Sequence, residues 1–318
     1  MTAQVALLTY ALVVSLAGAH WMQRAHWPRR SPRLGILAWQ ALTLSVVMSV
    51  LLTGLAVALP TMPITNDLAD LLHACAMALR EHYATPGGAA VASSGAVLAV
   101  AVSGRLAYCL ATSWWRLRYH RIAQWRRLDL VAQRHRGSGA LVVEHPTPAV
   151  YCIPGRRHDV VFTSAALTTL DDRQRAAVLA HERAHLRGRH DLVLAAADVL
   201  QAAFPVIPVF GVARAELARL IEMHADDQAL RSSDRRVLAT ALVRLADGGA
   251  PVGSLGAGGQ SALARVRRLA QPARPLGLVG SSLAVAATLM LVALPLVIAA
   301  VPAVAATAMD YCPVAFPA

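Results

Sequence analysis

Four long apolar stretches divide the chain, at about residues 2–19, 35–60, 88–114 and 275–309. A helix needs roughly 20 apolar residues to cross a hydrocarbon core about 30 Å thick. Only the third stretch contains a charged residue, Arg105, near its end. The first could instead be a signal peptide, but no basic segment precedes it and no clear cleavage site precedes Arg24. The pattern predicts four transmembrane helices, with a more polar segment at 115–274 between the third and the fourth.

The composition also indicates a membrane protein. Hydrophobic residues make up 56% of the chain and charged residues 15%, whereas globular proteins average about 45–50% and 25%. So apolar a chain is not disordered. Four cysteines in 318 residues are too few for a disulfide-rich miniprotein. The chain has no Gly-X-Y repeat, which excludes a collagen. The formal net charge is +12, and every basic residue is an arginine.

The arginines lie beside the apolar stretches in a pattern that predicts membrane orientation. The loop at 20–33 contains four arginines and no acid, whereas the loop at 61–87 contains three acids and one arginine. Seven arginines follow the third stretch at 116–136. Four more precede the last stretch, namely Arg265, Arg267, Arg268 and Arg274. Because arginine collects on cytoplasmic flanks, we expect 115–274 in the cytoplasm and both termini on the extracytoplasmic side of the plasma membrane.

The arginine-rich segment 116–136 has two interpretations. A flank that faces anionic lipid explains it best, because its aromatic residues stand where an interfacial belt belongs. A nucleic-acid site would require a recognisable binding motif, and none is present. We therefore expect the lipid bilayer as a partner and no direct binding of nucleic acid.

The cytoplasmic segment contains a His-Glu-x-x-His motif at residues 181–185. His181 and His185 are four residues apart, so on a helix they share one face and can bind one Zn²⁺ ion. Glu182 can then act as the general base toward a water molecule at the metal. Asp171 and Gln174 form a potential capping box for this helix, which continues without proline or glycine as far as Gly188.

A catalytic zinc site needs a third protein ligand, which we expect from a second helix. Glu222 and Asp226 are four residues apart in Leu-Ile-Glu-Met-His-Ala-Asp-Asp and share a helical face. Glu222 is the candidate ligand, and Asp226 is suited to hold a histidine ligand through its other ring nitrogen. His224 is a rival ligand, but it lies about 200° around the helix from Glu222. A solvated acidic helix is the alternative, since arginines surround this segment.

An uncharged stretch at 199–213 separates the two predicted helices. Fifteen residues are too few to span a membrane, and a single crossing would place Glu222 and His181 on opposite sides. We expect a helix that packs on the core or lies against the bilayer and ends at Pro205 and Pro208.

Taken together, these features resemble the regulatory membrane zinc metallopeptidases that transduce beta-lactam signals in bacteria as antirepressors. The similarity extends to their heat-shock and prenyl-protein protease relatives, which are membrane gluzincins. Residues 148–155 resemble the strand before the active site, 160–167 the following strand and helix start, and 170–182 the lead into the zinc helix. The resemblance implies that His181, His185 and Glu222 bind zinc, that Glu182 is catalytic and that Asp226 orients a ligand.

The resemblance has one departure, because the beta-lactam sensors carry an extracellular penicillin-binding domain after the last span. Here only residues 310–318 follow, without a Ser-x-x-Lys nucleophile. Direct covalent sensing of a beta-lactam is therefore not expected. Cys75 and Cys312 are both predicted on the outer side, where a disulfide and two free thiols are equally open.

The expected fold is mainly α, a polytopic membrane protein with four transmembrane helices and a cytoplasmic α+β zinc peptidase domain of gluzincin type. Its organisation is a membrane domain at 1–114, a peptidase domain at 115–274, a span at 275–309 and a short tail at 310–318. The predicted activity is zinc-dependent endoproteolysis. By resemblance the substrate is a cytoplasmic transcriptional repressor or the protease itself. The alternatives are a quality-control protease for membrane proteins and a non-catalytic signalling scaffold.

Overall fold

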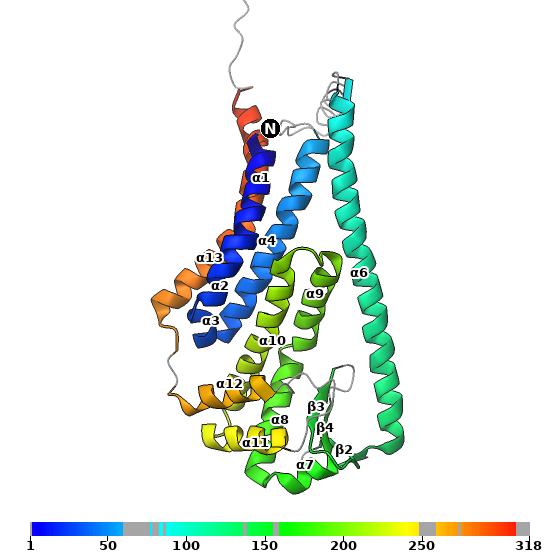
Figure 1. Ribbon diagram of the computed structural model, residues 1–318, viewed down its shortest axis with the longest axis vertical. Coiled ribbons are helices and arrows are strands. Elements are labelled where there is room, and N and C mark those ends of the chain that lie inside the picture. Colours follow the sequence, from blue (N-terminus) through cyan, green and yellow to red (C-terminus); the bar gives the residue numbers. More distant parts are fainter. Residues whose placement is uncertain are drawn as a thin grey trace, which may run out of the picture. The chain divides into compact units, whose positions relative to one another are not determined.

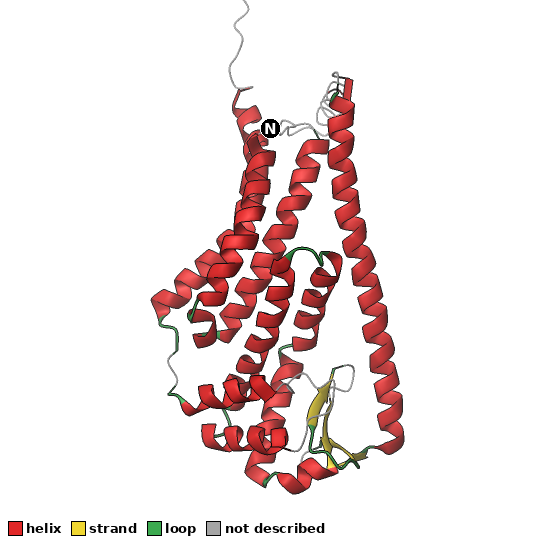
Figure 2. Ribbon diagram, viewed as in Figure 1, coloured by secondary structure: helices red, strands yellow, loops and turns green. Residues whose placement is uncertain are grey.

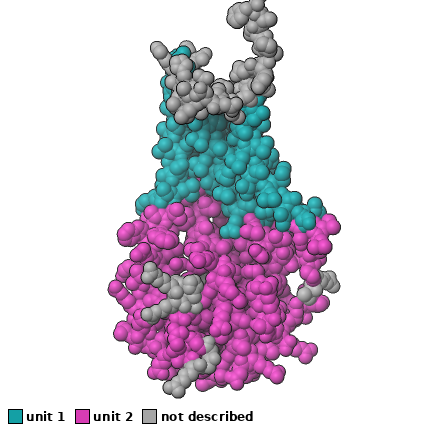
Figure 3. Space-filling model, turned by 180° about the vertical axis from the view of Figure 1, so that it is seen from behind, with its two compact units in different colours: residues 1–24, 38–108, 282–318 teal, residues 25–37, 109–281 magenta. Residues whose placement is uncertain are grey.

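The computed structural model describes residues 2–59, 77, 83–84, 87–135, 139–154, 159–247, 259–272 and 275–309. The predicted outer loop at 61–87 lies largely outside the described residues, and the tail at 310–318, Cys75 and Cys312 lie wholly outside them. Two compact units are distinguished (Figure 3). Unit 1 comprises residues 1–24, 38–108 and 282–318, and unit 2 comprises 25–37 and 109–281.

Four long apolar helices contribute most of their residues or their apolar part to unit 1, although the start of the second and the end of the third belong to unit 2 (Figures 1 and 2). The first is built from α1 (Thr2–Val13), a short π-helical segment (Val14–Gly18) and α2 (Ala19–Arg24). The others are α4 (Pro32–Ala58), α6 (Gly88–Val131) and α13 (Leu278–Met309). All four are long and apolar enough to cross a membrane. The third helix extends 17 residues beyond the apolar stretch predicted at 88–114, because the arginine-rich segment after it continues the helix to Val131.

The helices of unit 1 contain a glycine at a close helix–helix contact and buried hydroxyls that hydrogen-bond within their own helix. A Cβ on Gly95 of α6 would lie 2.6 Å from the Val57 Cβ of α4, so the two helices approach closely at this glycine. Four buried hydroxyls on α4 donate to carbonyls of the preceding helical turn, namely those of Thr43, Ser45, Ser49 and Thr53. Close approach at small residues and internally satisfied hydroxyls are typical of helices that pack in a bilayer.

A four-stranded mixed sheet lies at one end of unit 2 (Figure 1). The strands are β1 (Gln133–Arg134), β2 (Leu141–Val143), β3 (Val150–Ile153) and β4 (Asp159–Thr163), in the order β1-β2-β4-β3. β2 and β4 are parallel, and the other two pairs are antiparallel. Val161, in the central strand β4, is completely buried. β3 is therefore an edge strand of the described sheet.

Helices cover the sheet and complete unit 2. They are α3 (Trp27–Arg30), α7 (Ser164–Thr169), α8 (Asp172–Arg187), α9 (His190–Ala203), α10 (Pro208–Ala229), α11 (Arg235–Asp247) and α12 (Gly259–Ala270). α8 is central, since it contacts β3, β4, α9, α10 and α11. The segment 25–37 packs on α10, where a Cβ on Gly35 would lie 3.1 Å from the Leu220 Cδ1.

The uncharged stretch at 199–213 forms the end of a helical hairpin rather than one helix. α9 ends at Ala203, and α10 begins at Pro208, after a turn that contains Pro205. Proline lacks an N–H donor but fits the first turn of a helix, so the two prolines end α9 and start α10. The reversal of direction places α10 alongside both α9 and α8.

The predicted capping box at the start of α8 is confirmed. The Gln174 N–H donates to Asp171 Oδ1 at 2.9 Å, and the Asp171 N–H donates to Gln174 Oε1 at 3.2 Å. Two N–H groups that have no partner within the helix are thereby satisfied.

Replacing Asp171 with alanine is expected to lower the free energy of unfolding by about 1 kcal/mol, because the Gln174 N–H loses its acceptor. The matched control is Asp172→Ala, which removes only a surface ion pair with Arg175 and should cost less than about 0.5 kcal/mol. Denaturant unfolding of the solubilised protein, followed by circular dichroism, measures both changes. Equal effects of the two substitutions would contradict the capping role.

Candidate metal centre

The two histidines of the motif lie on one buried face of α8. His181 is 4% exposed and His185 is 5% exposed. Their Nε2 atoms face each other at 3.1 Å, and their rings meet edge to face with centroids 4.8 Å apart. Four-residue spacing on a helix produces this arrangement, because residues i and i+4 lie one turn apart.

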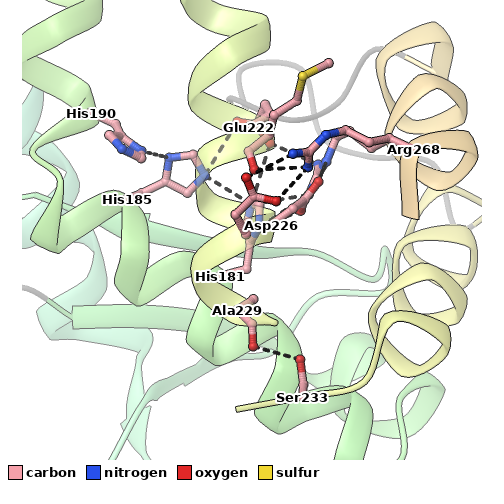
Figure 4. Close-up of polar contacts among 11 residues, drawn as sticks. His181, His185, His190, Glu222, Asp226, Ala229, Ser233 and Arg268 are labelled. Atoms are coloured by element: carbon pink, nitrogen blue, oxygen red, sulfur yellow. Dashed lines mark hydrogen bonds and ion pairs between the residues drawn. The ribbon is translucent and has the colours of Figure 1, made fainter. Parts of the chain in front are cut away.

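Glu222 reaches the same point from α10, which packs against α8. Its carboxylate is buried, with Oε2 3.6 Å from His181 Nε2 and Oε1 3.5 Å from His185 Nε2 (Figure 4). One potential ligand atom from each of His181, His185 and Glu222 therefore lies close to the same buried point. These three side chains are called the donor cluster below.

The spacing of these donors fits a tetrahedral zinc ion. Ligand atoms about 2.0–2.1 Å from zinc in tetrahedral positions lie about 3.3–3.4 Å from each other. The two histidine Nε2 atoms are 3.1 Å apart, and the two oxygens of the Glu222 carboxylate lie 3.5 and 3.6 Å from one histidine Nε2 each, so all three distances are close to this value. Two imidazoles and one carboxylate are also a ligand set that catalytic zinc sites use, with a fourth position left for water or substrate. These residues can therefore hold a zinc ion.

Asp226 lies one turn after Glu222 and is completely buried. Its Oδ1 atom is 3.0 Å from His181 Nδ1, the ring nitrogen that points away from the donor cluster. A carboxylate in this position fixes the ring orientation and keeps the proton on Nδ1. The structure thus brings Asp226 and His181 together, with Nε2 of the histidine directed at Glu222 and His185.

Arg265 of α12 is the main site residue that sequence analysis missed. It was counted with the cytoplasmic flank, but it is only 4% exposed. Its guanidinium contacts both Asp226 oxygens, at 2.6 and 2.9 Å, and its Nη1 lies 2.9 Å from Glu222 Oε2. The available signal was its position one turn before Leu269, because an arginine in phase with a buried leucine lies on the apolar face of its helix.

A comparison with protein families agrees with this geometry. Residues 128–273 match the sequence model of peptidase family M48. The matched segment is similar to the peptidase domain of that family. No curated protein and no solved structure matches the chain. The family is one of metallopeptidases, and the match covers the sheet, α8 and α10 as well as α12 with Arg265. It does not identify the beta-lactam transducers as a subgroup.

The electrostatics of this region place an ionised carboxylate at the donor cluster. Burial lowers the pKa of His181, but hydrogen bonds with Asp226 and Glu222 outweigh it and raise this pKa to about 9. Burial, followed by the charge of His181, lowers the pKa of His185 to about 3. Burial would raise the pKa of Glu222, yet its contact with His181 and the charge of Arg265 lower it. An ionised carboxylate thus faces two imidazoles, of which one carries a positive charge.

Glu182 lies next to His181 on α8 and is partly exposed. Burial and the charge of Glu222 raise its pKa to about 7, against the opposing charge of His181. The thiol of Cys152 in β3 hydrogen-bonds to this carboxylate, and burial followed by the charge of Glu182 raises the thiol pKa. A carboxylate with a pKa near neutrality can take up and release protons at physiological pH.

His224 does not belong to the donor cluster. Its ring instead lies near that of His190, with centroids 5.5 Å apart. Among the described residues, the group that can hold a metal consists of His181, His185 and Glu222. The geometry of α10 explains this difference, because positions 222 and 224 are about 200° apart around a helix.

Proposed function

We propose that this protein is a membrane zinc peptidase that hydrolyses peptide bonds on the cytoplasmic side. In this proposal His181, His185 and Glu222 bind the zinc ion, Glu182 is the catalytic base, and Asp226 orients His181. The observation that carries it is the convergence of His181, His185 and Glu222 on one buried point, with Glu182 next to His181 on the same helix. The M48 match supports the same reaction class.

When bound, zinc acts as a Lewis acid that polarises the scissile carbonyl and lowers the pKa of a water molecule to about 7. Glu182 removes a proton from the attacking water and passes it to the leaving amine. Its raised pKa suits both steps, because proton uptake and release are then nearly balanced at neutral pH. Asp226 holds the His181 ring in place, and Arg265 neutralises the buried carboxylates.

Internal cleavage of an extended chain is supported by the position of β3. This strand lies at the edge of the sheet, and its Cys152 contacts Glu182. An extended peptide could pair with the outer edge of β3 through backbone hydrogen bonds between the two strands. The bound peptide would then pass beside the catalytic base. Such binding does not require a chain terminus, so we propose an endopeptidase.

The membrane location rests on four apolar helices that are long enough to span a bilayer. We propose that the matched segment is cytoplasmic, because arginines flank it at both ends. The substrate class that we propose is a protein on that side, with a transcriptional repressor or the protease itself as first candidates through the resemblance to antirepressor peptidases.

The test compares new protein termini by mass spectrometry in cells that express the wild type or Glu182→Gln. Termini that depend on Glu182 would establish proteolysis and identify the substrate. A repressor among them would support signalling, whereas misfolded membrane proteins would support quality control. Identical termini in both strains, with zinc bound in both proteins, would favour the scaffold interpretation.

Replacing Glu222 with glutamine is expected to reduce zinc affinity by at least about 100-fold, because a neutral amide replaces an anionic ligand. The purified wild type should contain one zinc ion per chain. Glu216→Gln is the matched control on the same helix, where Glu216 pairs only with Arg219 in the described structure, and it should retain the metal. Measurement of zinc by atomic absorption after dialysis distinguishes the variants. Full zinc occupancy in Glu222→Gln would exclude this ligand.

A further inference from the structure

A third buried histidine, His190, contacts the donor cluster from outside. It is the first residue of α9 and is 2% exposed. Its Nδ1 atom lies 3.0 Å from His185 Nδ1, and the two rings meet edge to face at 89° with centroids 4.9 Å apart (Figure 4). His190 therefore touches the side of His185 that faces away from Glu222.

The connection between α8 and α9 is shaped so that His190 reaches this position. Only Gly188 and Arg189 separate the two helices. Arg189 has a φ of 46°, and it is the only residue other than glycine with positive φ in the described part of the chain. This left-handed conformation is unfavourable for a residue with a Cβ. Strain of this kind persists where the surrounding structure requires it, often beside a functional site.

Gly188 provides the space for the His190 ring. A Cβ at position 188 would lie 2.4 Å from His190 Nε2 and 2.7 Å from its Cδ2, which is too close for any side chain. The φ of Gly188 is −78°, so its backbone conformation does not require glycine. The absence of a side chain at 188 and the strained turn at 189 therefore serve the same contact.

The protons of the two rings can be assigned from the direction of His185. Its Nε2 atom faces His181 and Glu222, so a metal would be bound through Nε2 and the ring proton would be on Nδ1. The Nδ1–H group then needs an acceptor, and the Nδ1 of His190 lies 3.0 Å away. His190 must therefore be neutral, with its own proton on Nε2.

We propose that His190 is a positioning residue for the zinc site, where it accepts a hydrogen bond from His185 as Asp226 does from His181. Asp226 is negatively charged and His190 is neutral, and this difference agrees with the charge balance of the site. A zinc ion together with Arg265 carries three positive charges, which Glu182, Glu222 and Asp226 balance. A neutral acceptor at position 190 fixes His185 without adding an unbalanced charge to a buried site.

This inference rests on the proposed zinc site, and the test measures metal affinity rather than peptidase activity. The full-length protein in detergent is freed of metal, and its zinc affinity is determined by competition with a chromophoric chelator. His190→Leu removes the acceptor, and we expect a 10- to 100-fold weaker affinity, the usual effect of losing a ligand's hydrogen-bond partner. His190→Asn places an amide oxygen near the Nδ1 position and should restore affinity to within about threefold.

His224→Leu is the matched control, because His224 packs against His190 with ring centroids 5.5 Å apart but is not among the three converging donors, so the zinc affinity should stay unchanged. The visible spectrum of Co²⁺ bound in place of zinc gives a second readout, since a reoriented His185 changes the ligand field. The spectrum of His190→Leu should differ from the wild type, and that of His190→Asn should not.

Two results would overturn the proposal. One is wild-type zinc affinity in folded His190→Leu, and the other is an affinity in His190→Asn as weak as in His190→Leu, which would indicate packing alone. If His190→Leu does not fold, Gly188→Ala replaces it, since the new Cβ displaces the imidazole without removing it. Wild-type affinity in Gly188→Ala would then refute the contact. Absence of zinc binding by the wild type would instead refute the proposed function.

Discussion

Replacing Arg265 with methionine is expected to lower the free energy of unfolding of the zinc-free protein by about 3–5 kcal/mol, because two buried carboxylates lose their counterion. Arg265 contacts both oxygens of Asp226 and lies 2.9 Å from Glu222, and all three side chains are at most 6% exposed. Methionine fills similar space but provides no charge. The remaining cation among these groups would be a protonated His181, which cannot neutralise both acids.

Thermal unfolding with and without zinc tests this expectation. A loss of 3–5 kcal/mol corresponds to a fall of roughly 10 °C in the midpoint for a unit of this size. Saturating zinc should recover part of the loss, because the metal supplies the missing positive charge. The control is Arg268→Met on the same helix, which removes a partly exposed pair with Asp227 and should cost about 1 kcal/mol or less. Equal effects at positions 265 and 268 would refute the role of burial.

The α8 helix shows how much of the site local sequence can predict. Its capping box and its four-residue histidine spacing involve residues within one or two helical turns, so helix geometry alone places them. The same reasoning placed Glu222 and Asp226 on one face of α10, and both are buried there. That α10 packs against α8 could only be inferred from the chemical need for a third ligand.

Arg265 and His190 could not be predicted in the same way, because their roles depend on packing between distant elements. Arg265 is 39 residues from Asp226 and stands among other arginines. Its burial follows from the way α12 lies on α10 and α11. His190 is close in sequence to His185, but if α8 continued as a helix, position 190 would lie on a different face from position 185. The left-handed Arg189 redirects the chain, and nothing in an arginine side chain indicates positive φ.

The apolar stretches predicted the approximate positions of the long apolar helices among the described residues, because the length of a span depends only on local composition. Helix ends were harder to place. α6 continues to Val131 because the arginine-rich segment contains no proline or glycine and arginine is a good helix former. The stretch at 199–213 was uniform in hydrophobicity but not in structure, since its two prolines separate α9 from α10.

Replacing Glu182 with glutamine is expected to lower kcat for peptide hydrolysis by 10²- to 10⁴-fold, the range typical for loss of a general base. Glutamine has the same shape but cannot take a proton from water. Zinc content and KM should change little, because Glu182 is not among the three converging donors. Glu182→Asp keeps the carboxylate but withdraws it by one methylene, so it should retain more activity than glutamine.

The measurement is steady-state cleavage of a quenched fluorescent peptide by the protein in proteoliposomes, with zinc content determined on the same samples. Glu144→Gln is the control, since Glu144 follows β2 on the surface and accepts a hydrogen bond from Ser164. A Glu182→Gln variant with full zinc and wild-type kcat would assign the base to another group. A parallel loss of zinc and activity would mean instead that Glu182 supports the metal. Unchanged zinc with a lost kcat is the outcome that only a general base at position 182 explains.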